Sequence, residues 1–237
     1  MKKIRFFMTA VMVLTVLPLF AQRSARLNDF DRDVLAVRRH MRSYCALIQS
    51  AMKNNDDLMA QRSLPDIEQA GFLWEKIQKK YSKNPPAEYA GDAKFTGRLK
   101  TFQLLLDEMA YNVEQKKYQM SFNNCAFACG LFVKMHEENN LLYVSDRLFH
   151  LRKAIKKASA LQAAGQPLAG VFADIQQLRD QVYRAPFPDN NNFLPAMEKL
   201  SLSIDRIAYR IYHDGTERRV MLADLTDQIN ALYGLSL

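Results

Sequence analysis

The 237-residue sequence lacks the short motifs that mark the common enzyme classes. It contains no Gly-rich phosphate loop, no Gly-x-Ser-x-Gly nucleophile turn and no His-Glu-x-x-His zinc motif. No nucleophile with its base, and no set of metal ligands, stands out elsewhere in the sequence. We therefore expect a protein that is not an enzyme, has no cofactor and acts by binding or as a scaffold.

Long apolar runs are scarce, and the one present lies at the start of the chain. Residues 6–20 are almost without polarity, follow Lys2, Lys3 and Arg5, and lead to the small Ala21. This run of about fifteen residues is shorter than the roughly 20 that a membrane-spanning helix needs. The pattern predicts a signal peptide over residues 1–21 and export to the periplasm or the medium; an uncleaved membrane anchor is the alternative.

A large excess of basic charge is also missing. The net charge of +8 falls to +5 when Lys2, Lys3 and Arg5 leave with the signal peptide. Nucleic-acid-binding proteins concentrate basic charge far more strongly, so nucleic acid is excluded as a partner. We expect the partner to be a protein or an anionic component of the cell envelope, with membrane contact for the signal peptide alone.

Apolar residues recur at three- and four-residue steps through most of the chain, and no stretch alternates convincingly with period two. In the first half, amphipathic helices are predicted at residues 28–53, 63–81, 99–113 and 122–135. Ser63 is expected to cap the second of these helices. Pro85, Pro86 and Gly91 cannot continue a helix and predict a long crossover before the third. The predicted fold class is all-α.

The chain contains an internal repeat. Three segments of the first half recur in the same order in the second, namely 37–42 as 151–156, 66–69 as 174–177 and 107–111 as 205–209, with offsets of 114, 108 and 98 residues. The Pro-rich crossover recurs over residues 186–192, and the falling offset indicates shorter loops in the second half.

The repeat predicts a duplicated unit, because matches in order on equivalent helices indicate one shared design. Short connections force neighbouring helices to run antiparallel, so each unit is expected to be an up-down-up-down four-helix bundle. The predicted organisation is a signal peptide at 1–21, a first bundle at 22–139 and a second bundle at 140–237. The join falls within residues 137–146, either as a loop with Ser145 capping the next helix or as a continuous helix. The alternative is a single helical array with coincidental similarity.

The sequence has only three cysteines, and their helix positions predict one disulfide. Export places them in an oxidising compartment, and the first and fourth helices of an up-down-up-down bundle are antiparallel neighbours. Cys45 lies about eight residues before the end of its helix and Cys125 about eight after the start of the fourth, which is about 12 Å of helix in both cases. Cys45 is therefore expected to bond to Cys125, with Cys129 as the alternative partner.

Basic side chains stand at matching helix positions in the two halves. They are Arg38, Arg39, Arg42, Arg152, Lys153 and Lys156. These residues are candidates for a patch that contacts an anionic partner, such as a lipid headgroup or an acidic polysaccharide. The alternative is that they form ordinary solvated helix faces.

The segment Asn124-Cys125-Ala126-Phe127-Ala128-Cys129-Gly130 lies in the fourth helix of an exported unit with a long middle crossover, and in this setting it resembles the cytochrome c-prime family. That family attaches haem through Cys-x-x-Cys-His, with the histidine as the iron ligand. Here the cysteine spacing is one residue longer, and Gly130 stands where the histidine would be. The resemblance implies a four-helix bundle, and the missing histidine implies no covalent haem site.

A degenerate relative of a periplasmic haem or copper carrier is the alternative function. The three cysteines and the nearby Met41 are soft ligands of the kind that copper(I) prefers. Their supporting histidines are missing, because His136 is placed level with Asp31, about three turns away from Met41. The histidines are expected at the surface or at helix ends, and no metal site is predicted.

Overall fold

A computed structural model describes residues 27–214 and 222–237, and the predicted signal peptide lies outside the described residues. Within these ranges the chain is all-α, with no strand. The longer helices are α1 (Asp29–Asn54), α3 (Leu64–Tyr81), α4 (Phe95–Glu114), α5 (Tyr118–Glu138), α6 (Val144–Ala163), α7 (Ala169–Arg184), α8 (Phe193–Tyr209) and α9 (Ala223–Leu235). Short elements are α2 (Asp57–Gln61), the 3₁₀ turn η1 (Ala87–Tyr89) and the π-helical turn η2 (Arg210–Asp214).

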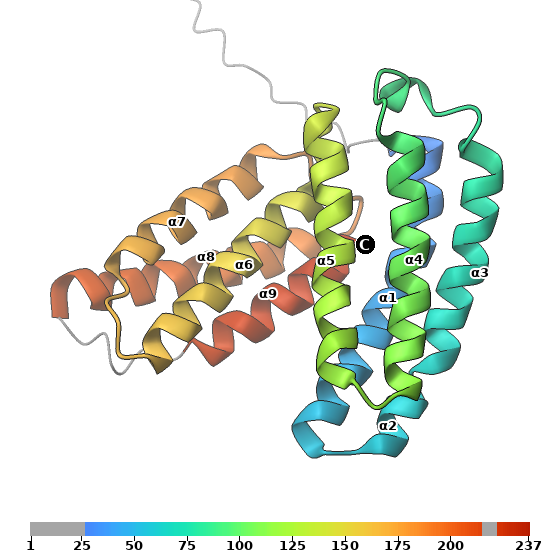
Figure 1. Ribbon diagram of the computed structural model, residues 1–237. Coiled ribbons are helices and arrows are strands. Elements are labelled where there is room, and N and C mark those ends of the chain that lie inside the picture. The colour runs from blue at the N-terminus through green and yellow to red at the C-terminus, as the bar shows by residue number, and fades with distance from the viewer. Residues whose placement is uncertain (1–26, 215–221) are drawn as a thin grey trace, which may run out of the picture.

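Two separate clusters of buried apolar side chains divide the helices into two groups. The first helix group, α1 to α5, packs α1 on α3 and α5, and α4 on α3 and α5. The second helix group, α6 to α9, packs α6 on α7 and α9, and α8 on α7 and α9. Figure 1 shows the first helix group upright on the right and the second tilted away to its left, with α5 and α6 meeting between them.

The first core is rich in aromatic rings, and the start of α1 supplies the ring at one end of this core. Phe30, on the first turn of α1, makes edge contacts with Trp74, Tyr81, Tyr89 and Phe95 at ring-centroid distances of 5.2 to 6.4 Å. Such edge-to-face geometry stabilises aromatic pairs beyond the area that they bury. The crossover after α3 carries Tyr89 into this cluster, and so the crossover is anchored to the start of α1.

The predicted helices are present, with three local differences. The polar run after α1 does end that helix, at Asn55 in the left-handed region, but it then starts the short helix α2, whose N-cap Asp56 accepts a hydrogen bond from the Met59 backbone N–H. Ser63 precedes α3 without a side-chain cap, because its hydroxyl instead donates to the Ala60 carbonyl. At the join the chain breaks between α5 and α6 over residues 139–143, so no continuous helix links them, and Tyr143 rather than Ser145 occupies the N-cap position.

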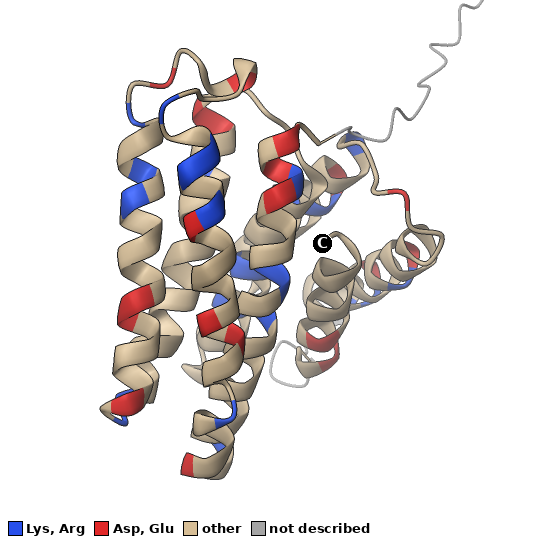
Figure 2. Cartoon of the chain, turned by 90° about the vertical axis from the view of Figure 1, so that its right-hand side faces the viewer, with Lys and Arg blue, Asp and Glu red and all other residues tan. Residues whose placement is uncertain are grey.

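Within the described residues, no helix is both long and apolar enough to cross a lipid bilayer. Positions of Lys and Arg and of Asp and Glu are scattered along the helices of both groups in Figure 2.

Candidate functional site

The site that we identify is a cleft where the two helix groups meet. Its walls come from the first three turns of α1, the end of α5, the link into α6, the crossover between α7 and α8, and the last turn of α9. The cleft has a volume of ≈ 410 Å³. Its polar floor includes Asp31, Arg38, His136, Tyr143 and Ser145.

Two ionisable side chains of this floor, Asp31 and His136, form a buried chain with a third, Asp146. His136, on the last turn of α5, lies between Asp31 of α1 and Asp146 of α6, with its Nε2 3.2 Å from Asp31 Oδ1 and its Nδ1 2.7 Å from Asp146 Oδ2. The three residues are only 2 to 3% exposed. Because the histidine belongs to the first helix group and Asp146 to the second, this chain joins the two groups.

Asp31 is the most heavily hydrogen-bonded member of the chain. The hydroxyl of Tyr89 donates to its carboxylate at 2.8 Å, that of Tyr143 at 2.6 Å, and the Asn28 side-chain amide at 2.8 Å. Burial acts to raise the pKa of Asp31, but the hydrogen bond and charge of His136, helped by the two tyrosines, outweigh it and lower the pKa. Asp31 is therefore an ionised carboxylate whose oxygens are already occupied by donors.

The same contacts fix the protonation state of His136. Burial acts to lower the pKa of the imidazole, but the hydrogen bonds and charges of Asp146 and Asp31 outweigh it and raise the pKa to about 9. At neutral pH the ring is an imidazolium that donates from both nitrogens. An imidazolium has no free lone pair, so in this state His136 is neither a general base nor a metal ligand.

The stability of the fold is expected to fall as His136 loses its proton. Its pKa rises from 6.5 to about 9 on folding, so its contribution is complete below pH 6.5 and is lost as the pH rises through about 9. At about 1.4 kcal/mol per pKa unit, the loss is on the order of 3 kcal/mol. Urea unfolding at pH 6, 8 and 10 measures this loss. The free energy of unfolding should depend less steeply on pH in His136→Gln, but not in His213→Gln, the control at an exposed residue. An unchanged slope in His136→Gln would contradict the assignment.

Three arginines of the predicted patch extend this junction, and of these Arg38 is buried while Arg39 and Arg42 are exposed. The Nη2 of Arg38 donates to the Tyr233 hydroxyl at 2.7 Å. Arg39 donates to the Leu237 carbonyl at 2.8 and 3.1 Å, and Arg42 to the Asn230 carbonyl at 3.2 Å. These contacts join α1 to the last two turns of α9 and to Leu237, which follows that helix.

Arg152, the counterpart of Arg38 in the repeat, reaches the same tyrosine. Its guanidinium carbon lies 4.5 Å from the centre of the Tyr233 ring, and that of Arg38 lies 5.8 Å from it. Tyr233 therefore contacts the two matching arginines at once. Lys153 and Lys156 are exposed on α6, as are Arg39 and Arg42 on α1, whereas Arg152 is half-buried and Arg38 is buried.

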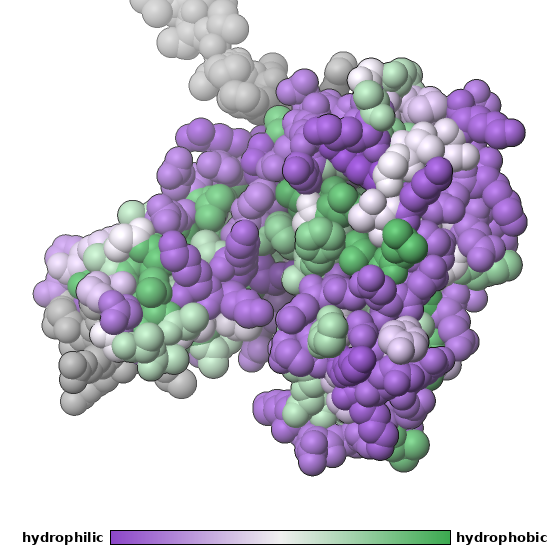
Figure 3. Space-filling model, in the orientation of Figure 1, coloured by the Kyte–Doolittle hydropathy of each residue, from purple (hydrophilic) through white to green (hydrophobic). Residues whose placement is uncertain are grey.

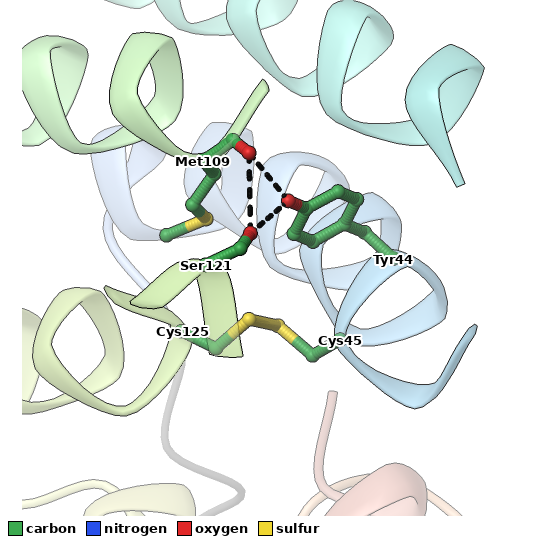
Figure 4. The surroundings of a disulfide bond; sticks show 5 residues. All are labelled: Tyr44, Cys45, Met109, Ser121 and Cys125. Carbon is green, nitrogen blue, oxygen red and sulfur yellow. Dashed lines mark hydrogen bonds between the residues drawn. A yellow bond between two sulfur atoms is a disulfide. The ribbon is translucent and has the colours of Figure 1, made fainter. Parts of the chain in front are cut away.

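The cysteines are paired as predicted from counting helical turns. Cys45 of α1 and Cys125 of α5 form a disulfide with a Cα–Cα distance of 6.2 Å, and Cys129 is free (Figure 4). Next to the disulfide, the hydroxyls of Tyr44 and Ser121 hydrogen-bond to each other and approach the Met109 carbonyl at 2.8 and 3.1 Å. This polar contact joins α1, α4 and α5 at the level of the disulfide.

His136 lies at a helix end, which is one of the two places expected for the histidines. It occupies the last turn of its helix at the level of Asp31, but it is buried, because the link and α6 cover it with Tyr143 and Asp146. The shared level of His136 and Asp31 was the signal in the sequence. The contacts of His136 with Asp146 and Tyr143 could not be predicted in this way, because the docking of the second helix group leaves no periodic signal in the sequence.

The described part of the chain shows no group of three or more His, Cys, Asp and Glu side chains arranged to hold a metal ion. Met41 is buried in the first core. No protein-family model, curated protein or solved structure matches the chain.

Proposed function

We propose that this chain is an exported, non-catalytic helical protein that acts by binding, and that the cleft between the two helix groups is its binding element. The observation that carries the proposal is the composition of the cleft. Apolar side chains such as Val34, Leu35 and Phe187 line it beside Arg38 and Arg39, while the carboxylate of Asp31 is already saturated by donors. Such a lining suits an anion with an apolar body.

A binding role fits the chemistry of the junction. The buried charges of Asp31 and His136 are matched to each other, and a protonated His136 offers no base to a substrate. This arrangement supports a fixed wall for a ligand. The partner that we infer is an anionic component of the envelope.

Export is supported by two features of the chain. Residues 1–21 have the charge and length pattern of a signal peptide. The disulfide between Cys45 and Cys125 is of the kind that persists in oxidising compartments.

The carrier alternative gains no support from the arrangement of its ligands. The disulfide uses two of the three cysteine sulfurs, and the remaining thiol, Cys129, lies near Arg38 and Tyr233. A soft-metal site needs several thiolate or thioether ligands together. We therefore do not propose haem or copper transport.

Two measurements on the full mature chain test the proposed function. Protein expressed with added haem and copper should be colourless and free of stoichiometric copper. In calorimetry it should bind octanoate more tightly than octanol, and Arg39→Gln should weaken octanoate binding while the exposed control Arg62→Gln should not. A Soret band or one copper per chain would reject the non-carrier assignment, and equal affinity for octanoate and octanol would reject the anion-binding cleft.

We further propose that the two helix groups are tandem four-helix bundles derived from one duplicated unit. The repeat offsets relate buried positions to buried positions. At offset 114, Val34, Val37 and Met41 correspond to Leu148, Leu151 and Ile155, and at offset 98, Phe95, Leu99, Phe102, Leu106 and Met109 correspond to Phe193, Met197, Leu200, Ile204 and Ile207. All of these side chains are buried, which supports one packing plan for both groups.

Fragments 22–139 and 140–237 are each expected to be helical and to unfold cooperatively, because each would contain its own core. Circular dichroism during urea unfolding of each fragment measures this. Two molten fragments, together with a single transition of the whole chain, would favour one merged array over two units.

A further inference from the structure

The third long helix of each group carries the same exposed apolar pair. On α4 these residues are Leu104, 63% exposed, and Tyr111, 55% exposed; on α8 they are Leu202, 66% exposed, and Tyr209, 59% exposed. The two pairs are related by the offset of 98 residues that relates the buried faces of these helices. Large apolar side chains at matched exposed positions are not needed by either core. Figure 3 shows that apolar side chains also gather at the surface over α4 and α5.

The charged residues on the same two faces are reversed in sign. Lys100 of α4 corresponds to Glu198 of α8, and Glu108 corresponds to Arg206; all four are exposed. Positions i, i+4, i+8 and i+11 share one face of a helix, so each helix presents a stripe of charge, leucine, charge and tyrosine. The α4 stripe is Lys100, Leu104, Glu108 and Tyr111, and the α8 stripe is Glu198, Leu202, Arg206 and Tyr209.

We propose that the α4 stripe of one copy of this chain packs on the α8 stripe of a second copy, with the two helices parallel. In this register Lys100 faces Glu198, Leu104 faces Leu202, Glu108 faces Arg206, and Tyr111 faces Tyr209. The antiparallel register would place Lys100 against Arg206 and Glu108 against Glu198, and like charges across an interface disfavour it. Asp107 and Asp205 flank the stripes, and Arg179 already forms an ion pair with Asp205.

The contact is heterologous, because it uses a different surface on each partner. One copy therefore keeps a free α8 stripe and its neighbour a free α4 stripe, so further copies can add in the same way. A single pair of helix faces is small for a protein interface, and association is expected to be weak and to increase with protein concentration.

Charge reversal tests the proposal in the full mature chain. Sedimentation velocity over a concentration series should show association of the wild type, and Glu108→Arg or Arg206→Glu alone should weaken it about tenfold. An equimolar mixture of the two variants should associate again, because the α4 stripe of each variant then meets an α8 stripe of opposite charge on the other variant. The chain with both substitutions should associate like the wild type.

The exposed charges of α3 provide matched controls, because Glu75→Arg and Lys79→Glu lie outside both stripes and should leave association unchanged. Circular dichroism of every variant checks that the fold is intact. A wild type that stays monomeric at its highest soluble concentration overturns the proposal. It is also overturned if only one single variant weakens association, which would indicate contacts between two identical helices, or if the mixed variants fail to associate.

Discussion

Asp31→Ala is expected to lower the free energy of unfolding by about 3 to 5 kcal/mol, the cost of leaving a buried charge without its partner. The substitution removes the acceptor for Tyr89, Tyr143 and Asn28 and leaves the imidazolium of His136 with Asp146 alone. Both Tyr89 and Tyr143 are buried, so their hydroxyls would lose a partner that water cannot readily replace. Urea unfolding at pH 6, where His136 is charged, measures the effect.

Asp29 provides the matched control for this prediction. It lies two residues earlier on α1, is 77% exposed at its side chain and pairs with the exposed Arg32. Exposed ion pairs contribute about 0 to 1 kcal/mol, so Asp29→Ala should have a small effect. Equal losses from Asp29→Ala and Asp31→Ala would show that the buried cluster does not stabilise the junction.

Loss of the disulfide is expected to have an effect of similar size. The bond joins residues 80 positions apart, and in the chain-entropy model its removal lowers the free energy of unfolding by about 4 kcal/mol. The bond lies at the contact of α1 with α5, so its loss should affect the first helix group more than the second. Urea unfolding of Cys45→Ala, and of the wild type with and without reductant, measures this loss.

Cys129→Ser is the control for the disulfide, because Cys129 is the free thiol. It should change stability far less than Cys45→Ala and should leave the effect of reductant intact. Mass mapping of the oxidised protein should give a Cys45–Cys125 peptide. Three free thiols in protein purified without reductant would contradict the pairing.

The sequence predicted those features that follow from helix periodicity. Spacing located the long helices of the first half, and counting turns from the helix ends placed Cys45 level with Cys125 and His136 level with Asp31. Both inferences needed only the rise of a helix and the antiparallel order of α1 and α5. Short elements escaped this reasoning, since α2 spans only five residues and no periodicity emerges at that length.

The junction could not be predicted in the same way, because it depends on how the two helix groups dock. Arg38 stands among polar positions of α1 and was expected on a solvated or partner-binding face. In the structure Tyr233 covers it, 195 residues further along the chain. The tyrosines that donate to Asp31 come from the crossover and from the link, two segments whose course the apolar spacing does not determine.

The floor of the cleft holds a histidine that is charged at neutral pH, and in that state its ring has no free lone pair with which to accept a proton. The most direct test is an NMR titration of the His136 ring nitrogens from pH 5 to 10, with His136→Gln used to assign the signal. Both nitrogens are expected to be protonated at pH 7, and the ring is expected to titrate with a pKa of about 9. A ring that is neutral at pH 7, or a pKa near 6.5, would contradict this expectation.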